Sequence, residues 1–285
     1  MELRTENLSH VYSRGTPFER TAIENVSVTI PDGQFLGLIG HTGSGKSTFI
    51  QHLNGLLTPT SGRILCDGVD INSSKALTVG IRFKVGLVFQ YPEYQLFEET
   101  VFRDIAFGPK NMGLTDDEVR ERVLEAARFV GVPEEIFEKS PFDLSGGQKR
   151  RVAIAGVIAM RPGVLILDEP TAGLDPAGRE SVLKNIADYQ RDTQSTVILV
   201  THSMAEIARI AERLIVFSEG RVAMDGTPGE IFERGPELSA MGLSVPEVTR
   251  IAARLRELGV EVPGGIYTME QLRNAILRLK GEGEC

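Results

Sequence analysis

The chain has 285 residues, of which 41% are hydrophobic and 25% are charged, as expected for one large α/β domain with a small appendage. Its formal net charge of −8 argues against general affinity for nucleic acid, which requires clustered positive charge. No apolar run approaches the roughly eighteen residues of a membrane-spanning helix, and the first residues lack the apolar core of a signal peptide, so we expect a cytosolic protein. Two cysteines, Cys66 and Cys285, are too few for a disulfide framework, and we expect Cys66 to be a small buried hydrophobe.

Short β-rich runs alternate with helical patterns as far as Gly226, which is typical of a mostly parallel sheet covered by helices. Continuous apolar runs among them predict strands that are buried on both faces. The expected strands are residues 3–12, 22–30, 35–39, 85–89, 164–167 and 197–200. Helical patterns cover about residues 46–57 and 102–130.

The pattern changes after Gly226. Apolar residues recur at helical spacing over residues 248–258 and 272–279, and Pro263-Gly264-Gly265 separates the two predicted helices. This tail, residues 227–285, is small for an independent core. We therefore expect it to pack on the main domain or on a second copy in a dimer.

A glycine-rich loop connects the strand at 35–39 with the helix that follows. Its residues fit the G-x-x-x-x-G-K-[ST] pattern. Glycines allow successive backbone N–H groups to surround phosphate oxygens, and the helix N-terminus adds partial positive charge. Lys46 would reach the β- and γ-phosphates of ATP, and the Ser47 hydroxyl would ligate Mg²⁺. The strand–loop–helix context disfavours the alternative, a glycine-rich turn with a surface lysine. The predicted nucleotide-binding residues here are Gly40, His41, Thr42, Gly43, Ser44, Gly45, Lys46, Ser47 and Thr48.

Two carboxylates, Asp168 and Glu169, follow the apolar strand at 164–167. Neighbouring strand residues point to opposite faces, so the two acids need not share a role. Strands of an open α/β sheet deliver such groups to the ligand crevice at their carboxyl ends. Asp168 is suited to orient the Mg²⁺ shell and Glu169 to polarise a water in line with the γ-phosphate. The alternative is a helix-capping acid pair.

A second phosphate-binding corner is predicted at Leu144-Ser145-Gly146-Gly147-Gln148, which opens a helix with a serine hydroxyl and two glycines. One chain cannot surround a single γ-phosphate with both corners. We infer a head-to-tail dimer in which ATP lies between the loop of one subunit and this corner of the other. A simple capping turn is the alternative.

With these motifs, residues 3 to about 232 resemble the ATPases of ABC transporters. The resemblance implies an α/β fold, a P-loop NTPase of the ABC type, with a mostly parallel core sheet, an antiparallel β subdomain and an α-helical signature subdomain at about 91–160. The ATPase domain would be residues 1–226, followed by a small helical C-terminal extension at 227–285. His202 follows the strand at 197–200, where the family has a histidine that contacts the γ-phosphate, so Glu169 and His202 are the implied catalytic residues.

The resemblance assigns further positions. Asp175, in Ala172-Gly173-Leu174-Asp175, matches the D-loop aspartate that faces the partner subunit. Gln90 stands at the Q-loop, which touches Mg²⁺ and reports to the membrane subunits. Tyr12 matches an aromatic that stacks on adenine, although a core tyrosine would look the same. Lys149-Arg150-Arg151 could form a nucleic-acid patch, but the acidic chain favours packing and ion pairs.

Residues 90–101 and 12–19 resemble the energy-coupling factor branch of the family, and the latter segment its second paralogous ATPase. This implies hydrolysis that powers uptake of a vitamin or metal ion at the cytoplasmic face of the membrane. The implied partners are a second ATPase, in a homo- or heterodimer, a transmembrane coupling protein and a membrane substrate-binding protein, with no nucleic acid. Alternatives are a soluble ABC ATPase of DNA repair or translation, a P-loop kinase, or the ATPase of another ABC importer.

The segment after Gln90 predicts the docking surface for the membrane subunit. It combines apolar and acidic side chains within a few residues, which favours a groove with apolar walls and an acidic rim, suited to a helix that carries arginines. A purely structural segment would instead bury its apolar members. The residues concerned are Tyr91, Glu93, Tyr94, Leu96, Phe97, Glu98 and Glu99.

Overall fold

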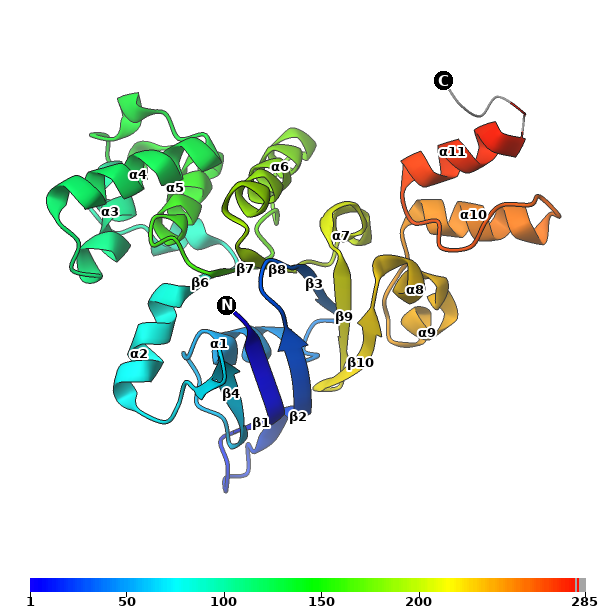
Figure 1. Ribbon diagram of the computed structural model, residues 1–285, viewed down its shortest axis with the longest axis horizontal. Coiled ribbons are helices and arrows are strands. Elements are labelled where there is room, and N and C mark those ends of the chain that lie inside the picture. Colours follow the sequence, from blue (N-terminus) through cyan, green and yellow to red (C-terminus); the bar gives the residue numbers. More distant parts are fainter. Residues whose placement is uncertain (280, 282–285) are drawn as a thin grey trace.

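The larger of two β-sheets forms the centre of the computed structural model, which describes residues 1–279 and 281 (Figure 1). Its strand order is β10-β9-β3-β8-β7-β6, and only the β9–β10 pair is antiparallel. β3, β6 and β8 are buried along their whole length, which explains their uninterrupted apolar sequences. The strands are β3 (Phe35–Gly40), β6 (Val85–Val88), β7 (Val164–Asp168), β8 (Thr196–Val200), β9 (Arg213–Ser218) and β10 (Arg221–Gly226).

The smaller sheet is antiparallel, with the order β2-β1-β4-β5. Its inward-facing residues, among them Leu3 and Ile23, join Leu36 of β3 and Phe49 of α1 in one buried cluster that includes Cys66. The expected combination of a mostly parallel core and an antiparallel β subdomain is therefore confirmed. The elements are β1 (Leu3–Tyr12), β2 (Arg20–Ile30), β4 (Ser61–Cys66), β5 (Val69–Asp70) and α1 (Lys46–Leu53).

A helical lobe containing α3, α4 and α5 stands on one side of the core sheet (Figure 1). The helical pattern predicted over 102–130 forms two helices, because Gly113 adopts a left-handed conformation and Thr115 starts a new helix through a capping box with Glu118. The lobe comprises η1 (Pro92–Gln95), α3 (Val101–Asn111), α4 (Asp116–Val130), η2 (Glu134–Ile136), η3 (Pro141–Asp143) and α5 (Gly146–Ile158).

Helix α1 ends earlier than residue 57. Gly55 is left-handed with φ 69°, and the Asn54 amide donates to the carbonyl of Val85, so the chain leaves the helix after Leu53. The remaining helices before residue 227 each begin at a serine or aspartate cap. They are α2 (Lys75–Lys84), α6 (Pro176–Thr193) and α7 (Met204–Ile210).

The C-terminal extension projects on the side of β10, away from the helical lobe (Figure 1). Its last two helices enclose a small core of their own that the sequence did not lead us to expect, with Val248 and Leu272 among its members. Ile231 and Phe232 of α8 belong to the same buried cluster as Val216 of β9, so the extension packs on the main domain as well. Cys285 lies outside the described residues. The helices are α8 (Pro228–Glu233), α9 (Gly235–Ala240), α10 (Glu247–Glu257) and α11 (Met269–Leu279).

Throughout the described residues, every helix is too short or too polar to cross a membrane.

Candidate functional site

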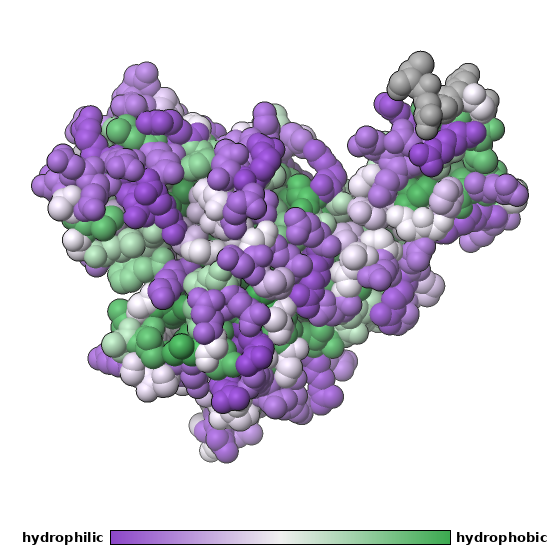
Figure 2. Space-filling view, in the orientation of Figure 1, coloured by the Kyte–Doolittle hydropathy of each residue, from purple (hydrophilic) through white to green (hydrophobic). Residues whose placement is uncertain are grey.

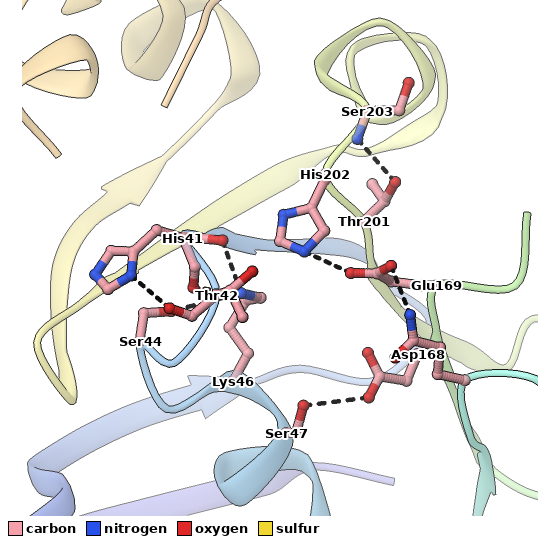
Figure 3. Close-up of polar contacts among 12 residues, drawn as sticks. His41, Thr42, Ser44, Lys46, Ser47, Asp168, Glu169, Thr201, His202 and Ser203 are labelled. Atoms are coloured by element: carbon pink, nitrogen blue, oxygen red, sulfur yellow. Dashed lines mark hydrogen bonds and ion pairs between the residues drawn. The ribbon is translucent and has the colours of Figure 1, made fainter. Parts of the chain in front are cut away.

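Three strands of the core sheet end side by side and bring the predicted residues together. Leu38 of β3 and Asp168 of β7 both pair with Val200, the last residue of β8. The glycine-rich loop, the two carboxylates and His202 therefore follow neighbouring strands at the carboxyl edge of the sheet (Figure 3).

The loop needs glycine at two positions for reasons of space. A Cβ on Gly45, which has φ 105°, would lie 2.7 Å from the Ala22 carbonyl oxygen. A Cβ on Gly40 would lie 2.4 Å from the Phe217 carbonyl oxygen. Gly45 is also the N-cap of α1 and supplies no side-chain cap, so the first N–H groups of the helix stay available to an anion.

Lys46 lies inside this loop. Its Nζ donates to the carbonyl oxygens of Gly40 at 2.7 Å and His41 at 3.0 Å. Burial lowers the pKa of Lys46, while the nearby Glu169 and Asp168 carboxylates oppose that shift. A partly desolvated positive charge at the floor of a cleft favours an anionic ligand.

Ser47 and Asp168 form a small set of oxygen donors. The Ser47 hydroxyl donates to Asp168 Oδ2 at 3.3 Å. Burial raises the pKa of Asp168, the charge of Glu169 raises it further, and the Ser47 hydrogen bond opposes both. Mg²⁺ in nucleotide sites takes one or two carboxylates, with phosphate oxygens and waters as its other ligands. A hydroxyl beside one carboxylate therefore fits Mg²⁺ bound together with ATP.

Both carboxylate oxygens of Glu169 have partners. His202 Nε2 lies 2.5 Å from Glu169 Oε1, and Gln90 Nε2 donates to Oε2 at 3.2 Å (Figure 3 shows the His202 contact). Glu169 has φ 50°, and its backbone N–H donates to the Val200 carbonyl oxygen at 2.9 Å. A left-handed glutamate costs roughly 1–3 kcal/mol and persists only where surrounding contacts hold it, which is common at active sites. The side chain is thus fixed with its carboxylate toward the cleft.

A cleft of about 490 Å³ unites these groups. Gly40, His41 and Ser44 belong to the loop but not to the lining. The predicted residues that line it are Tyr12, Thr42, Gly43, Gly45, Lys46, Ser47, Thr48, Gln90, Asp168, Glu169 and His202.

Tyr12 of β1 and Arg20 of β2 line the side of the cleft that the smaller sheet forms. Tyr12 is 40% exposed, so it is not the core tyrosine of the alternative interpretation. The sequence analysis missed Arg20 and Ala22, which also line the cleft. Arg20 pairs with Tyr12 across β1 and β2, and a Cβ on Gly43 would lie 3.7 Å from its Nη2. The hairpin-like spacing of the two strands was the signal that could have revealed it.

The second phosphate corner is not part of this cleft. Ser145 caps α5, where its Oγ accepts from the Gln148 N–H at 3.4 Å and its own N–H donates to Gln148 Oε1 at 3.0 Å. Gly146 and Gly147 open the helix, and a Cβ on either would meet nothing within 4 Å. Asp175 caps α6 by accepting from the Gly178 N–H at 2.7 Å. Within one subunit these residues act as helix caps, and their contact with a partner's nucleotide stays a prediction.

The segment after Gln90 is largely exposed. Tyr94 is 86% and Phe97 is 58% exposed, whereas Leu96 is buried at 9%. Leu96 and Phe97 line a groove of about 310 Å³ whose other wall includes Phe107 and Met160. A purely structural segment would have buried these aromatic side chains.

The prediction that Glu93 belongs to an exposed acidic rim is wrong. This carboxylate turns inward and accepts from Arg150 through Oε2 at 3.1 Å and Oε1 at 2.8 Å. Arg150 is only 3% exposed in its side chain, and its Nη1 also donates to the carbonyl oxygens of Pro170 and Ala172. Arg150 thus has the packing and ion-pair role that was preferred over nucleic-acid binding.

Comparison with known proteins identifies the family. The ABC transporter family model matches residues 23–172. The energy-coupling factor transporter ATP-binding protein EcfA2 of Caldanaerobacter subterraneus subsp. tengcongensis is 53% identical over 98% of this chain and 97% of that protein. The protein of the same name from Clostridium perfringens is 54% identical over 98% of both. The chain belongs to the energy-coupling factor transporter ATP-binding proteins.

Solved structures agree with this membership. The structure of cbiO1 from Clostridium perfringens, described as part of the ABC transporter complex cbiONQ, matches with a TM-score of 0.74 and 39% identity over 90% of this chain and 96% of that one. A dimeric ATP-binding cassette, MJ0796 bound to ADP and Pi, matches with a TM-score of 0.71 and 29% identity over 79% and 98%. This energy-coupling factor ATP-binding protein is therefore an ATPase of a transporter, as predicted, and resembles the second paralogue. A role in DNA repair or translation is not favoured.

Proposed function

We propose that the chain binds MgATP in the cleft and hydrolyses it as one half of a head-to-tail ATPase dimer, with a paralogue or a second copy as its partner. The observation that carries the proposal is the separation of its two phosphate corners. Lys46, Ser47, Asp168, Glu169 and His202 share one cleft, whereas the corner around residue 145 lies in the helical lobe. A second subunit is needed to bring such a corner to the same nucleotide.

Each residue near the phosphates has a distinct task in this proposal. Lys46 and the N-terminus of α1 bind the β- and γ-phosphates. Ser47, Asp168 and Gln90 would hold Mg²⁺, which supplies neutralisation of phosphate charge when bound. Glu169 polarises the attacking water, and His202 turns from Glu169 to the γ-phosphate. Positioning and electrostatics provide nearly all of the rate enhancement in phosphoryl transfer.

Arg20→Ala should weaken ATP binding about two- to tenfold, because an exposed cation beside the phosphate loop is lost. The difference should shrink as salt rises, since exposed charges are screened. Arg14→Ala is the matched control, because Arg14 belongs to the same loop region but does not line the cleft. Titration of the full chain with ATP at low and high salt measures both effects. An equal loss of ATP affinity in the two variants would show that Arg20 makes no specific contact with ATP.

We also propose that the groove beside Phe97 receives a transmembrane coupling protein at the cytoplasmic face of the membrane. Exposed aromatic side chains next to an apolar groove can supply the affinity for a docked helix. A membrane substrate-binding protein would complete a transporter for a vitamin or metal ion. Half-buried Glu98 and exposed Glu99 remain available to orient basic groups of that helix, although Glu99 also pairs with Arg103.

Tyr94→Ser combined with Phe97→Ser should abolish capture of the membrane partner while the subunit still binds ATP. Glu93 is left intact, because it pairs with buried Arg150. Phe18→Ser is the matched control, since Phe18 is 83% exposed and lies in the loop between β1 and β2. Co-purification from membranes and a thermal melt of the isolated subunit give the two readouts. Normal assembly by the double variant would contradict the docking site, and a collapsed melting temperature would show that the aromatic residues stabilise the fold.

The extension at 227–285 is a further proposed contact between the two ATPases. Ile251, Leu258, Met269 and Leu279 are exposed, and Figure 2 shows apolar surface between α10 and α11. A helix pair that covers its own small core and still exposes apolar side chains is suited to bind a similar surface on a neighbour.

A further inference from the structure

Tyr12 contacts Thr48, which also lines the cleft, and His10, and both of these residues contact His52. The Tyr12 hydroxyl lies 3.3 Å from Thr48 Oγ1, and the Thr48 carbonyl oxygen lies 2.7 Å from His52 Nδ1. His52 Nε2 is 3.2 Å from His10 Nδ1. The His10 ring returns to Tyr12 edge-on, with ring centroids 4.5 Å apart. Thr48, His52 and His10, called here the Tyr12 support, therefore close a ring of contacts between β1 and the helix that follows the phosphate loop.

The protons of the Tyr12 support follow from its acceptors. The Thr48 carbonyl can only accept, so His52 Nδ1 carries a proton. His52 is completely buried, and burial lowers its pKa, which keeps the ring neutral and leaves Nε2 as an acceptor. His10 then donates from Nδ1, whose N–H also faces the Thr58 carbonyl oxygen at 3.2 Å. Main-chain carbonyls thus fix the tautomer of both rings.

We propose that His10 and His52 are positioning residues for the nucleotide base, acting through Tyr12. This inference rests on the proposed stacking of the base on Tyr12. An exposed aromatic side chain that becomes immobile on binding loses rotamer freedom, which weakens affinity roughly two- to tenfold. The Tyr12 support removes that loss by holding the ring in place beforehand. It also ties the base platform to α1, so the base and phosphate subsites keep a constant separation.

The test compares ATP with inorganic tripolyphosphate, which has no base, as ligands of the full chain with Mg²⁺. His10→Phe keeps an aromatic edge against Tyr12 but removes the N–H that His52 accepts. We expect its Kd for ATP to rise two- to tenfold, with no change for tripolyphosphate. Tyr12→Ala should weaken ATP binding at least as much. In a Tyr12→Ala background, His10→Phe should have no further effect on ATP binding, because it acts only through that ring.

Three results would overturn the inference. Equal weakening of ATP and tripolyphosphate by His10→Phe would mean that the histidines only stabilise α1. Additive effects of His10→Phe and Tyr12→Ala would mean that His10 acts independently of Tyr12. Unchanged ATP affinity in His10→Phe, with a clear loss in Tyr12→Ala, would leave the proposed base platform standing without its support. Unchanged affinity in Tyr12→Ala would instead remove the base platform itself.

A second variant keeps the inference testable if His10→Phe folds poorly in a thermal melt. His10→Asn keeps an N–H donor near the position of Nδ1 and loses the ring edge. We expect His10→Asn to lose less ATP affinity than His10→Phe and to keep its affinity for tripolyphosphate. A loss shared with tripolyphosphate would overturn the inference here too.

Discussion

Glu169→Gln should lower steady-state ATP hydrolysis by roughly two to four orders of magnitude while ATP binding persists. The amide retains the shape of the carboxylate and can still accept from His202, but it cannot take a proton from water. Because the proposed binding of ATP depends on Lys46 and the loop, ATP should still close the dimer and accumulate in it. Phosphate release by the assembled transporter measures the first effect, and size-exclusion chromatography with ATP measures the second.

Glu180→Gln is the matched control for this substitution. Glu180 is a surface carboxylate on α6 that pairs with Arg209 at 2.7 Å, so its loss should leave hydrolysis unchanged. Hydrolysis at the normal rate by Glu169→Gln would remove Glu169 from its proposed role. A loss of ATP binding in the same variant would show that the carboxylate supports the loop rather than the water.

The residues that line the centre of the cleft could be predicted because their placement depends on local rules. A glycine-rich loop between a strand and a helix carries its geometry in its own sequence. Asp168, Glu169 and His202 follow from parallel strands that end at one edge. The break at Gly113 is equally local, since the spacing of Thr115 and Glu118 is that of a capping box.

Other features depend on tertiary packing that the sequence pattern does not carry. Arg20 reaches the cleft through the antiparallel register that sets it opposite Tyr12. In the sequence, Glu93 lies near other acidic residues, which favours an exposed position at the rim of the docking groove. Its partner Arg150 lies 57 positions away on α5. The small core of the C-terminal extension joins residues of two helices across the Pro-Gly-Gly turn. The helical spacing of apolar residues predicted the two helices but could not predict which side chains they bury against each other.

Arg150→Met should lower the free energy of unfolding by about 3–5 kcal/mol, because it leaves Glu93 as a shielded charge without a partner. The Glu93 side chain is only 16% exposed, so water compensates it poorly. The substitution also removes the donor to the carbonyl oxygens of Pro170 and Ala172, two residues that follow closely on Glu169 in the chain. Urea denaturation of the isolated subunit provides the measurement.

Two further variants separate the ion pair from general damage to the helical lobe. Arg161→Met removes an exposed arginine that pairs with Glu121 and Glu125, and should cost no more than about 1 kcal/mol. Combining Arg150→Met with Glu93→Leu removes both charges and should recover part of the loss, since no isolated carboxylate remains. Recovery cannot be complete, because the two backbone carbonyls still lack their donor. If Arg150→Met were as mild as Arg161→Met, Glu93 would have to be hydrated in solution, and the acidic rim predicted for the docking groove would be restored.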